Sequence, residues 1–202
     1  MHSATTPFTL RPWKQGNRHE RRSGWRGTSA EFGDITVTCP LPRNQPGIVI
    51  SEVSGGSIPT ASFESRGIHT DAAVLPTLNR ATLRLGDALV HMTRNRWALT
   101  HRGRALHLKY GGDKYRLWAV NRRACVLSRA ADDEDSGVTV TVKGSGRGKK
   151  RQMAVNVAGR AVAADIVLAT LFAGIDRSTL TRRGTVRAAV SRTVGIYAES
   201  QY

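Results

Sequence analysis

Proline, cysteine and acidic residues are scarce or unevenly placed in this 202-residue sequence, and each shortage is informative. All seven prolines lie in the first 76 residues, so the rest of the chain lacks the strongest breaker of regular structure. The two cysteines, Cys39 and Cys125, form no CxxC pair, which excludes a zinc ribbon and a CxxC redox motif. The simplest interpretation is two reduced thiols in a cytoplasmic protein.

Acidic side chains are outnumbered, with 15 Asp and Glu against 31 Lys and Arg, which gives a formal net charge of +16. Such a charge attracts polyanions, and the possible partners are anionic lipid and nucleic acid. Arginine outnumbers lysine by 25 to 6, which the codon bias of a GC-rich genome also produces. The charge alone therefore does not establish a nucleic-acid-binding protein, and no feature indicates an oligomeric state.

Long apolar runs are also missing, because no run reaches the roughly 20 residues that span a membrane. The N-terminus lacks the apolar core of a signal peptide. Residues 1–33 show no apolar period, so we expect a disordered basic tail there. Its tryptophans, Trp13 and Trp25, either dock onto the folded domain or stack on bases, and docking is the simpler reading. Residues 34–79 hold short β-branched runs between prolines and glycines, and we expect a less regular part of the domain.

A regular pattern begins after Arg80. Apolar and polar residues alternate there along short runs, and turn-forming residues separate the runs. Successive side chains of a strand point to opposite faces, so each run is apolar on one face. The turns follow each other at roughly 8–10 residues, as in consecutive antiparallel hairpins. The runs are 82–85, 90–92, 106–110, 115–119, 138–143 and 153–157.

The period changes between Ala163 and Phe172, where apolar residues occupy every side of a predicted helix. A helix that is apolar all round is either buried or spans a membrane, and this run is about half the length needed for spanning. The predicted strands are the only elements that can cover the apolar surface of this helix. We therefore predict a mainly β fold over 34–176, an antiparallel meander curved or closed into a barrel around one hydrophobic helix at about 163–173.

This order of elements, a strand meander that ends in Ala163-Ala164-Asp165-Ile166-Val167-Leu168-Ala169-Thr170-Leu171-Phe172, resembles the tubby-like barrel group, which includes the LURP-one-related proteins. The resemblance covers about residues 80–176 and rests on element order, with no signature motif matched residue by residue. It implies a helix threaded through a closed antiparallel barrel, a non-enzymatic scaffold and, for tubby itself, phosphoinositide binding. The chain departs from the tubby pattern because about 26 residues follow the helix, whereas tubby proteins end at theirs.

The best-defined polar feature is a glycine-rich hairpin tip at 144–151. Its four cations and its backbone N–H groups could bind phosphate, and the alternative is a solvated tip. It is not a Walker A loop, because a strand follows and no Ser or Thr succeeds the lysine. The acidic turn 132–135 begins the same hairpin, so we expect acidic and basic ends on a polarised surface. The candidate anion-binding residues are Arg147, Lys149, Lys150 and Arg151.

Catalytic and metal signatures are weak, and we expect no catalytic residue, cofactor or metal. His91, His101 and His107 lie within 17 residues but on different predicted strands, without an HExxH motif. The acidic turn lacks the EF-hand spacing, and no GxSxG, kinase or dinucleotide motif is present. Two structures are compatible with the basic segment 177–202. Its valine spacing suits an amphipathic helix, and part of it also suits a strand.

Three functions are compatible with these features. The first is a non-enzymatic barrel module that binds lipid headgroups or other polyanions through the basic loop. The second is a nucleic-acid-binding protein that uses Arg-rich tails. The third is an enzyme or small-ligand carrier with a site inside the barrel.

Overall fold

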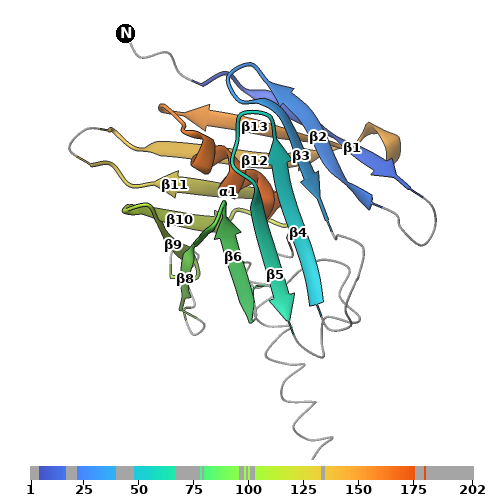
Figure 1. Ribbon diagram of the computed structural model, residues 1–202. Coiled ribbons are helices and arrows are strands. Elements are labelled where there is room, and N and C mark those ends of the chain that lie inside the picture. The colour runs from blue at the N-terminus through green and yellow to red at the C-terminus, as the bar shows by residue number, and fades with distance from the viewer. Residues whose placement is uncertain are drawn as a thin grey trace, which may run out of the picture.

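A computed structural model describes residues 5–16, 22–39, 48–66, 78, 80–95, 98, 100, 103–132, 135–175 and 180. In this part of the chain thirteen strands form one antiparallel sheet, in the order β7-β6-β5-β4-β3-β2-β1-β13-β12-β11-β10-β9-β8. The sheet curves into a nearly closed barrel around one helix, α1 (Figure 1). The predicted fold class, mainly β with an antiparallel meander around a hydrophobic helix, is confirmed.

The strands fall into two half-sheets. The N-terminal half-sheet contains β1 (Phe8–Gln15), β2 (Arg22–Ser29), β3 (Gly33–Thr38), β4 (Ile48–Gly55), β5 (Ala61–Arg66), β6 (Ala81–Leu85) and β7 (Ala88–Leu89). The C-terminal half-sheet contains β8 (His91–Arg94), β9 (Leu106–Tyr110), β10 (Asp113–Ala119), β11 (Ala124–Arg129), β12 (Val138–Ser145) and β13 (Gln152–Ala158). A 3-10 turn, η2 (Gly148–Lys150), joins β12 to β13, and α1 (Ala163–Ala173) follows β13.

The two half-sheets are joined at two places, along β1, which changes partners, and at the short β7–β8 segment. The first half of β1 pairs with β13, up to Leu10 opposite Met153, and the second half pairs with β2, starting with Arg11 opposite Arg26. The short strands β7 and β8 are separated only by Val90, and they pair with β6 and β9 respectively. Each half-sheet thus passes into the other at a corner made by one extended segment.

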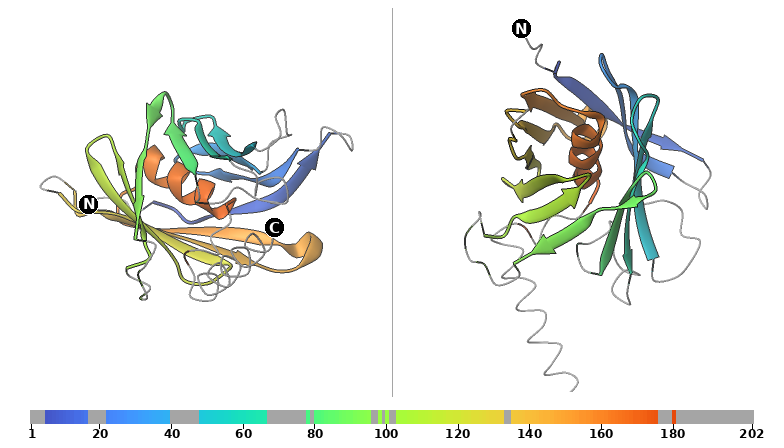
Figure 2. Two further views of the ribbon diagram at one scale, coloured as in Figure 1. Left: turned by 90° about the horizontal axis from the view of Figure 1, so that it is seen from below. Right: turned by 60° about the vertical axis from the view of Figure 1, so that its left-hand side comes forward.

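Helix α1 lies between the two half-sheets (Figure 2). It packs on β11 and β12 of one half-sheet and on β4 and β5 of the other, and every residue from Asp165 to Phe172 is buried. The Phe172 ring meets the Phe63 ring of β5 edge to face, with 5.8 Å between their centroids. Each large apolar side chain enclosed this way stabilises the fold by about 1.5–3 kcal/mol. The expectation that strands wrap an all-round apolar helix is confirmed.

The expected disordered tail over residues 1–33 is wrong for the residues that the structure describes there. Strands β1 and β2 lie in that range, and Phe8 and Leu10 face the core. Strand β2 contains little apolar surface and is held by ladder bonds to both β1 and β3. Pro12 comes just after β1 has left β13, where a missing N–H is tolerated. The barrel therefore begins at β1 and not at residue 34.

Candidate functional site

The predicted basic loop forms a tight hairpin tip between β12 and β13. Gly146 and Gly148 have φ values of +75° and +55°, and a Cβ atom on Gly146 would lie 2.0 Å from the Lys150 carbonyl oxygen. The N–H of Lys150 donates to the Arg147 carbonyl at 3.1 Å, and the N–H of Arg151 donates to the Gly148 carbonyl at 3.3 Å. These two N–H groups are used inside the turn, so side-chain charge is the larger part of what the tip offers to an anion.

The cations of the tip point into solvent. Arg147, Lys150 and Arg151 are exposed, and none of them forms an ion pair with a residue that the structure describes. The side chain of Lys149 lies outside the described part. Three of the four predicted anion-binding side chains are therefore gathered on one exposed turn, with no counter-charge among the described residues.

Arg151 is held in place by an aromatic ring from another strand. Its guanidinium carbon lies 5.2 Å from the centroid of the Trp25 ring on β2, and Trp25 itself packs against the core. The contact forms at the corner where β1 leaves β13. A guanidinium stacked on an indole keeps its planar fork of N–H donors available at the edge, in the geometry that suits phosphate oxygens.

The outer face of the same corner is also cationic. Arg26 lies over the Trp13 ring at 4.8 Å and donates from Nε to Thr36 Oγ1 at 3.2 Å, while Arg11 stands directly opposite Arg26 in the ladder. Trp13 donates from Nε1 to the Val37 carbonyl at 3.3 Å. Both N-terminal tryptophans thus dock on the folded domain, which confirms the simpler of the two readings of their role.

The acidic and basic turns lie at opposite ends of one hairpin, as expected. The β12–β13 ladder runs from Ser145 opposite Gln152, beside the basic loop, to Thr139 opposite Ala158, beside the turn that holds Asp132. The described acids Asp132 and Asp135 therefore lie at the end of this hairpin opposite the basic loop.

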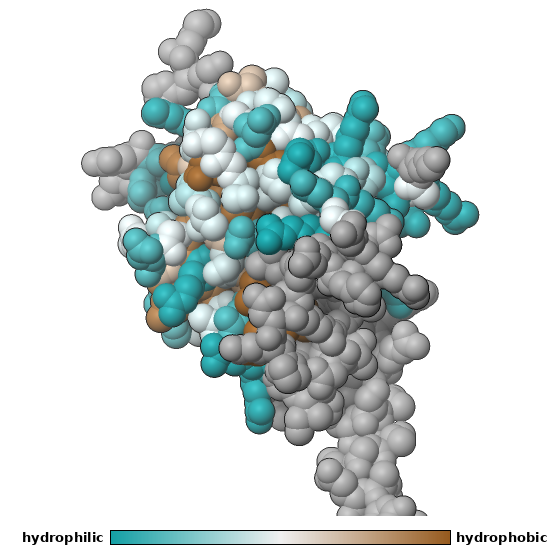
Figure 3. All heavy atoms as spheres, turned by 45° about the vertical axis from the view of Figure 1, so that its right-hand side comes forward, coloured by the Kyte–Doolittle hydropathy of each residue, from teal (hydrophilic) through white to brown (hydrophobic). Residues whose placement is uncertain are grey.

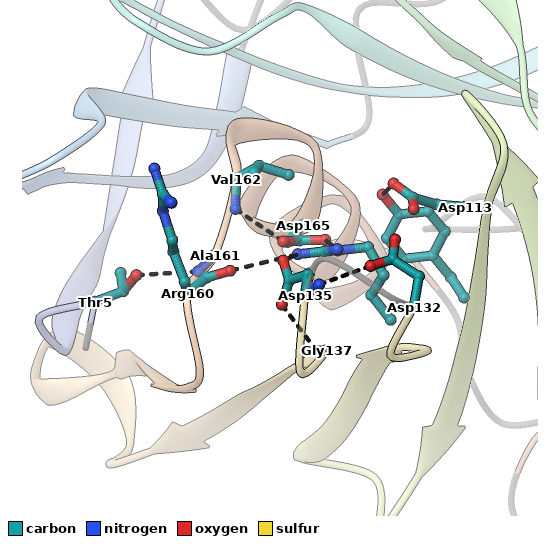
Figure 4. Close-up of polar contacts among 11 residues, drawn as sticks. Thr5, Asp113, Asp132, Asp135, Gly137, Arg160, Ala161, Val162 and Asp165 are labelled. Atoms are coloured by element: carbon teal, nitrogen blue, oxygen red, sulfur yellow. Dashed lines mark hydrogen bonds and ion pairs between the residues drawn. The ribbon is translucent and has the colours of Figure 1, made fainter. Parts of the chain in front are cut away.

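A buried polar cluster occupies the acidic end and was not anticipated from the sequence (Figure 4). Arg129 of β11 donates from Nε to Asp165 Oδ1 at 3.0 Å, from Nη2 to Asp135 Oδ2 at 2.8 Å and from Nη2 to the Arg160 carbonyl at 3.4 Å. Asp165 is fully buried, and its other oxygen accepts the N–H of Val162 at 2.8 Å. One arginine thus fastens the start of α1 to β11 and to the acidic turn.

The electrostatics of this cluster indicate a structural role. Burial raises the pKa of Asp165, while the Val162 N–H and the Arg129 guanidinium oppose that effect. The hydrogen bond from Arg129 lowers the pKa of Asp135 below its usual range. Burial alone would lower the pKa of Arg129, but its bonds to the two carboxylates raise it. Because each charged group in the cluster has a partner, nothing is left poised for chemistry.

The histidines and cysteines form no reactive group within the described residues. His91 and His107 are exposed on the outer faces of β8 and β9, and His101 lies outside the described part. No cluster of three or more His, Cys, Asp or Glu side chains that could hold a metal occurs among the residues that are described. Cys39 and Cys125 are buried and are not joined in a disulfide, and burial raises the pKa of Cys39 to about 11.

No protein-family model, no curated protein and no solved structure matches the chain. Among the helices that the structure describes, none has the length and apolar character to cross a membrane.

Proposed function

We propose that the protein is a non-enzymatic β-barrel module that binds the phosphate groups of polyanions through the β12–β13 loop. The residues that hold the anion are Arg147, Lys149, Lys150 and Arg151. The observation that carries the proposal is Arg151, which is held on the Trp25 ring at 5.2 Å beside two exposed cations that have no described counter-charge. Stacking fixes the orientation of the guanidinium before the anion arrives, so less entropy is lost on binding.

The filled interior supports a surface function over a carrier or an enzyme. Ile166, Leu168, Leu171 and Phe172 of α1 have 0% exposure and occupy the space that a ligand would need inside the barrel. Ligand-carrying barrels keep that space open. The buried Arg129 cluster supports the same view, because its charges are satisfied by each other.

The resemblance to the tubby-like group adds to this proposal. It rests on the barrel around a hydrophobic helix, and it suggests a scaffold that contacts phosphate-bearing headgroups. The rival proposal is nucleic-acid binding by disordered Arg-rich tails. The described part of the N-terminal segment is not such a tail, because β1 and β2 are strands of the barrel. Residues 181–202 lie outside the described part and add nothing to either proposal.

The test compares two charge-reversed variants of the full chain that change the net charge equally. The loop variant is Lys150→Glu with Arg151→Glu, and the matched control is Arg84→Glu with Arg160→Glu, which reverses exposed cations elsewhere. Inositol hexakisphosphate serves as a soluble phosphate probe, and phosphatidylcholine vesicles containing phosphatidylserine serve as a membrane probe. Binding is measured by titration calorimetry and by vesicle sedimentation.

We expect the loop variant to bind inositol hexakisphosphate at least about tenfold more weakly than the control variant, equivalent to about 1.4 kcal/mol. Loss of binding to the soluble probe alone identifies free phosphate chemistry, and loss on vesicles as well extends it to headgroups. If the two variants bind both probes equally, the loop is not the binding site and the proposal fails.

A further inference from the structure

A second cationic surface lies on the outer wall of the barrel, over β8, β9 and β10. The ladder places His91, Lys109 and Lys114 side by side in one row across the three strands. The next row holds Thr93, His107 and Arg116, and Trp118 follows on β10. We call this surface the outer basic patch; it consists of His91, His107, Lys109, Lys114, Arg116 and Trp118.

The two lysines of the outer basic patch face each other, and no described residue forms an ion pair with either. Directly opposed side chains on neighbouring antiparallel strands lie about 4.5–5.5 Å apart at Cβ, and like charges there destabilise the sheet. Lys109 and Lys114 are both exposed, and neither has an ion pair with any residue in the described part of the chain. A bound polyanion would neutralise both lysines, which gives this destabilising pair a function.

The carboxylates that the structure describes in the adjoining turns, those of Asp113, Asp132 and Asp135, have partners of their own. Asp113 accepts the Tyr115 hydroxyl at 3.3 Å, and Asp135 binds Arg129 at 2.8 Å. Asp132 accepts the N–H of Asp135 at 2.7 Å. These acids stabilise the acidic end of the barrel and do not neutralise the outer basic patch.

Further cations connect this patch with the β12–β13 loop. Lys143 stands on the outer face of β12, and Arg123 lies in the turn before β11, where its carbonyl accepts the Gly144 N–H at 2.7 Å. The eight residues of β12 span about 26 Å at about 3.3 Å per residue. A compact headgroup can contact only one end of a surface of this length, whereas an extended polymer can contact all of it.

The chemistry of the surface favours a nucleic acid over a membrane. Interfacial membrane binding needs a continuous apolar face. The exposed large apolar residues in the described part are Leu89, Val120 and Val162, which belong to three separate segments. On the face that Figure 3 shows, which brings the right-hand side of Figure 1 forward, apolar residues lie among hydrophilic ones. In contrast, Trp118 is half-buried with the Arg116 guanidinium 5.7 Å from its ring, and cations beside aromatic rings suit stacked bases and phosphates.

We infer that the outer basic patch and the β12–β13 loop form one continuous binding surface for a single-stranded nucleic acid. The loop end of this surface rests on the proposed function, and the inference adds the class of polyanion and a second contact region. The strand runs across β8, β9 and β10 through contacts to Lys109 and Lys114, passes Trp118, and reaches Lys150 and Arg151 at the loop. Affinity then depends on salt and on the length of the strand.

The experiment titrates the full chain with fluorescent oligothymidylate of about 16 nucleotides, the upper site size of a comparable β-barrel domain. The patch variant is Lys109→Ser with Lys114→Ser, and the matched control is Arg84→Ser with Arg160→Ser. Serine removes the charge without creating a new like-charge pair, so the patch variant keeps its melting temperature or gains slightly. Trp118→Leu serves as a second variant that leaves the net charge unchanged.

We expect the patch variant to bind oligothymidylate about tenfold more weakly than the control. The slope of log K against log salt should become shallower by about 1.4, because each lost phosphate contact on a single strand removes about 0.7. Trp118→Leu should also weaken binding about tenfold with little change in the salt slope. An oligomer of about four nucleotides should bind more weakly than the longer one, because it covers only one end of the surface.

The outcomes separate this inference from the proposed function. If the patch variant and Trp118→Leu bind oligothymidylate like the control, or if the unmodified chain does not bind it, the inference is overturned. The loop can then still bind inositol hexakisphosphate through Lys150 and Arg151. If the patch variant loses binding to phosphatidylserine vesicles but not to oligothymidylate, a membrane occupies the surface and the inference is also overturned.

Discussion

Replacing Arg129 with methionine should destabilise the barrel more than almost any other single change at a polar position. Arg129→Met keeps an unbranched apolar stem but removes all three contacts of the guanidinium, to Asp165, Asp135 and the Arg160 carbonyl. Asp165 then remains fully buried at the start of α1, with the Val162 N–H as its remaining described donor. A buried carboxylate that has lost its cation is strongly unfavourable.

The magnitude follows from that uncompensated charge. Removing one partner of a buried ion pair costs about 3–5 kcal/mol, compared with a total stability of about 5–15 kcal/mol for a typical domain. With a urea m-value of about 1–3 kcal/mol/M, the midpoint should fall by at least about 1 M. Replacing both partners, in Arg129→Met with Asp165→Asn, should recover most of the loss, because an apolar and neutral pair needs no counter-charge.

Urea unfolding followed by tryptophan fluorescence measures these differences, and its pH dependence adds a second check. In Arg129→Met the pKa of Asp165 rises further above its unfolded value. Protonation therefore favours the folded state, and the variant's deficit should shrink as the pH falls through that raised pKa. The reasoning is refuted if the single variant loses less than about 1 kcal/mol, or if the double variant is no more stable than the single one.

Three further predictions concern the core and the N-terminus. Phe172→Ala should lower the free energy of unfolding by about 3–5 kcal/mol in the same assay, because the ring is fully enclosed; a loss below about 1 kcal/mol would mean that α1 is not wrapped. Cys39 should resist thiol reagents at pH 8 until the protein unfolds, and stability should fall by about 2–3 kcal/mol as the pH rises from 9.0 to about 11, a fall that Cys39→Ala removes. Deleting residues 1–15 should abolish cooperative unfolding, because β1 joins the two half-sheets, whereas a dispensable tail would leave the transition unchanged.

The sequence was informative wherever one face of an element carries most of the apolar residues. Strands such as β12 and β13 show clean alternation, and α1 shows apolar residues on every side, so both could be predicted with nearly correct bounds. The barrel was predicted because only the strands could cover a helix that is apolar on every side. Strand β5 was missed because Ser65 occupies one of its buried positions and weakens the apolar pattern.

Other features depend on contacts between distant segments, which alternation does not encode. Strand β2 has one large apolar residue, Trp25, and its order comes from its neighbours. Arg129 points inward, on the same side of β11 as Cys125 and Leu127. A cation at such a position indicates a buried carboxylate partner, but that partner, Asp165, lies 36 residues away. The basic loop was found from composition alone, whereas the outer basic patch required the cross-strand register.

The central claim is that ligands bind the outer surface of a barrel whose interior is filled by α1. The most direct measurement is an amide chemical-shift titration of the full chain with the oligothymidylate of about 16 nucleotides. The account predicts shifts in the β12–β13 loop and along β9 and β10, with the amides of Ile166 to Phe172 unchanged. Shifts concentrated in that stretch of α1, with the loop unaffected, would show that the ligand enters the barrel and would contradict the account.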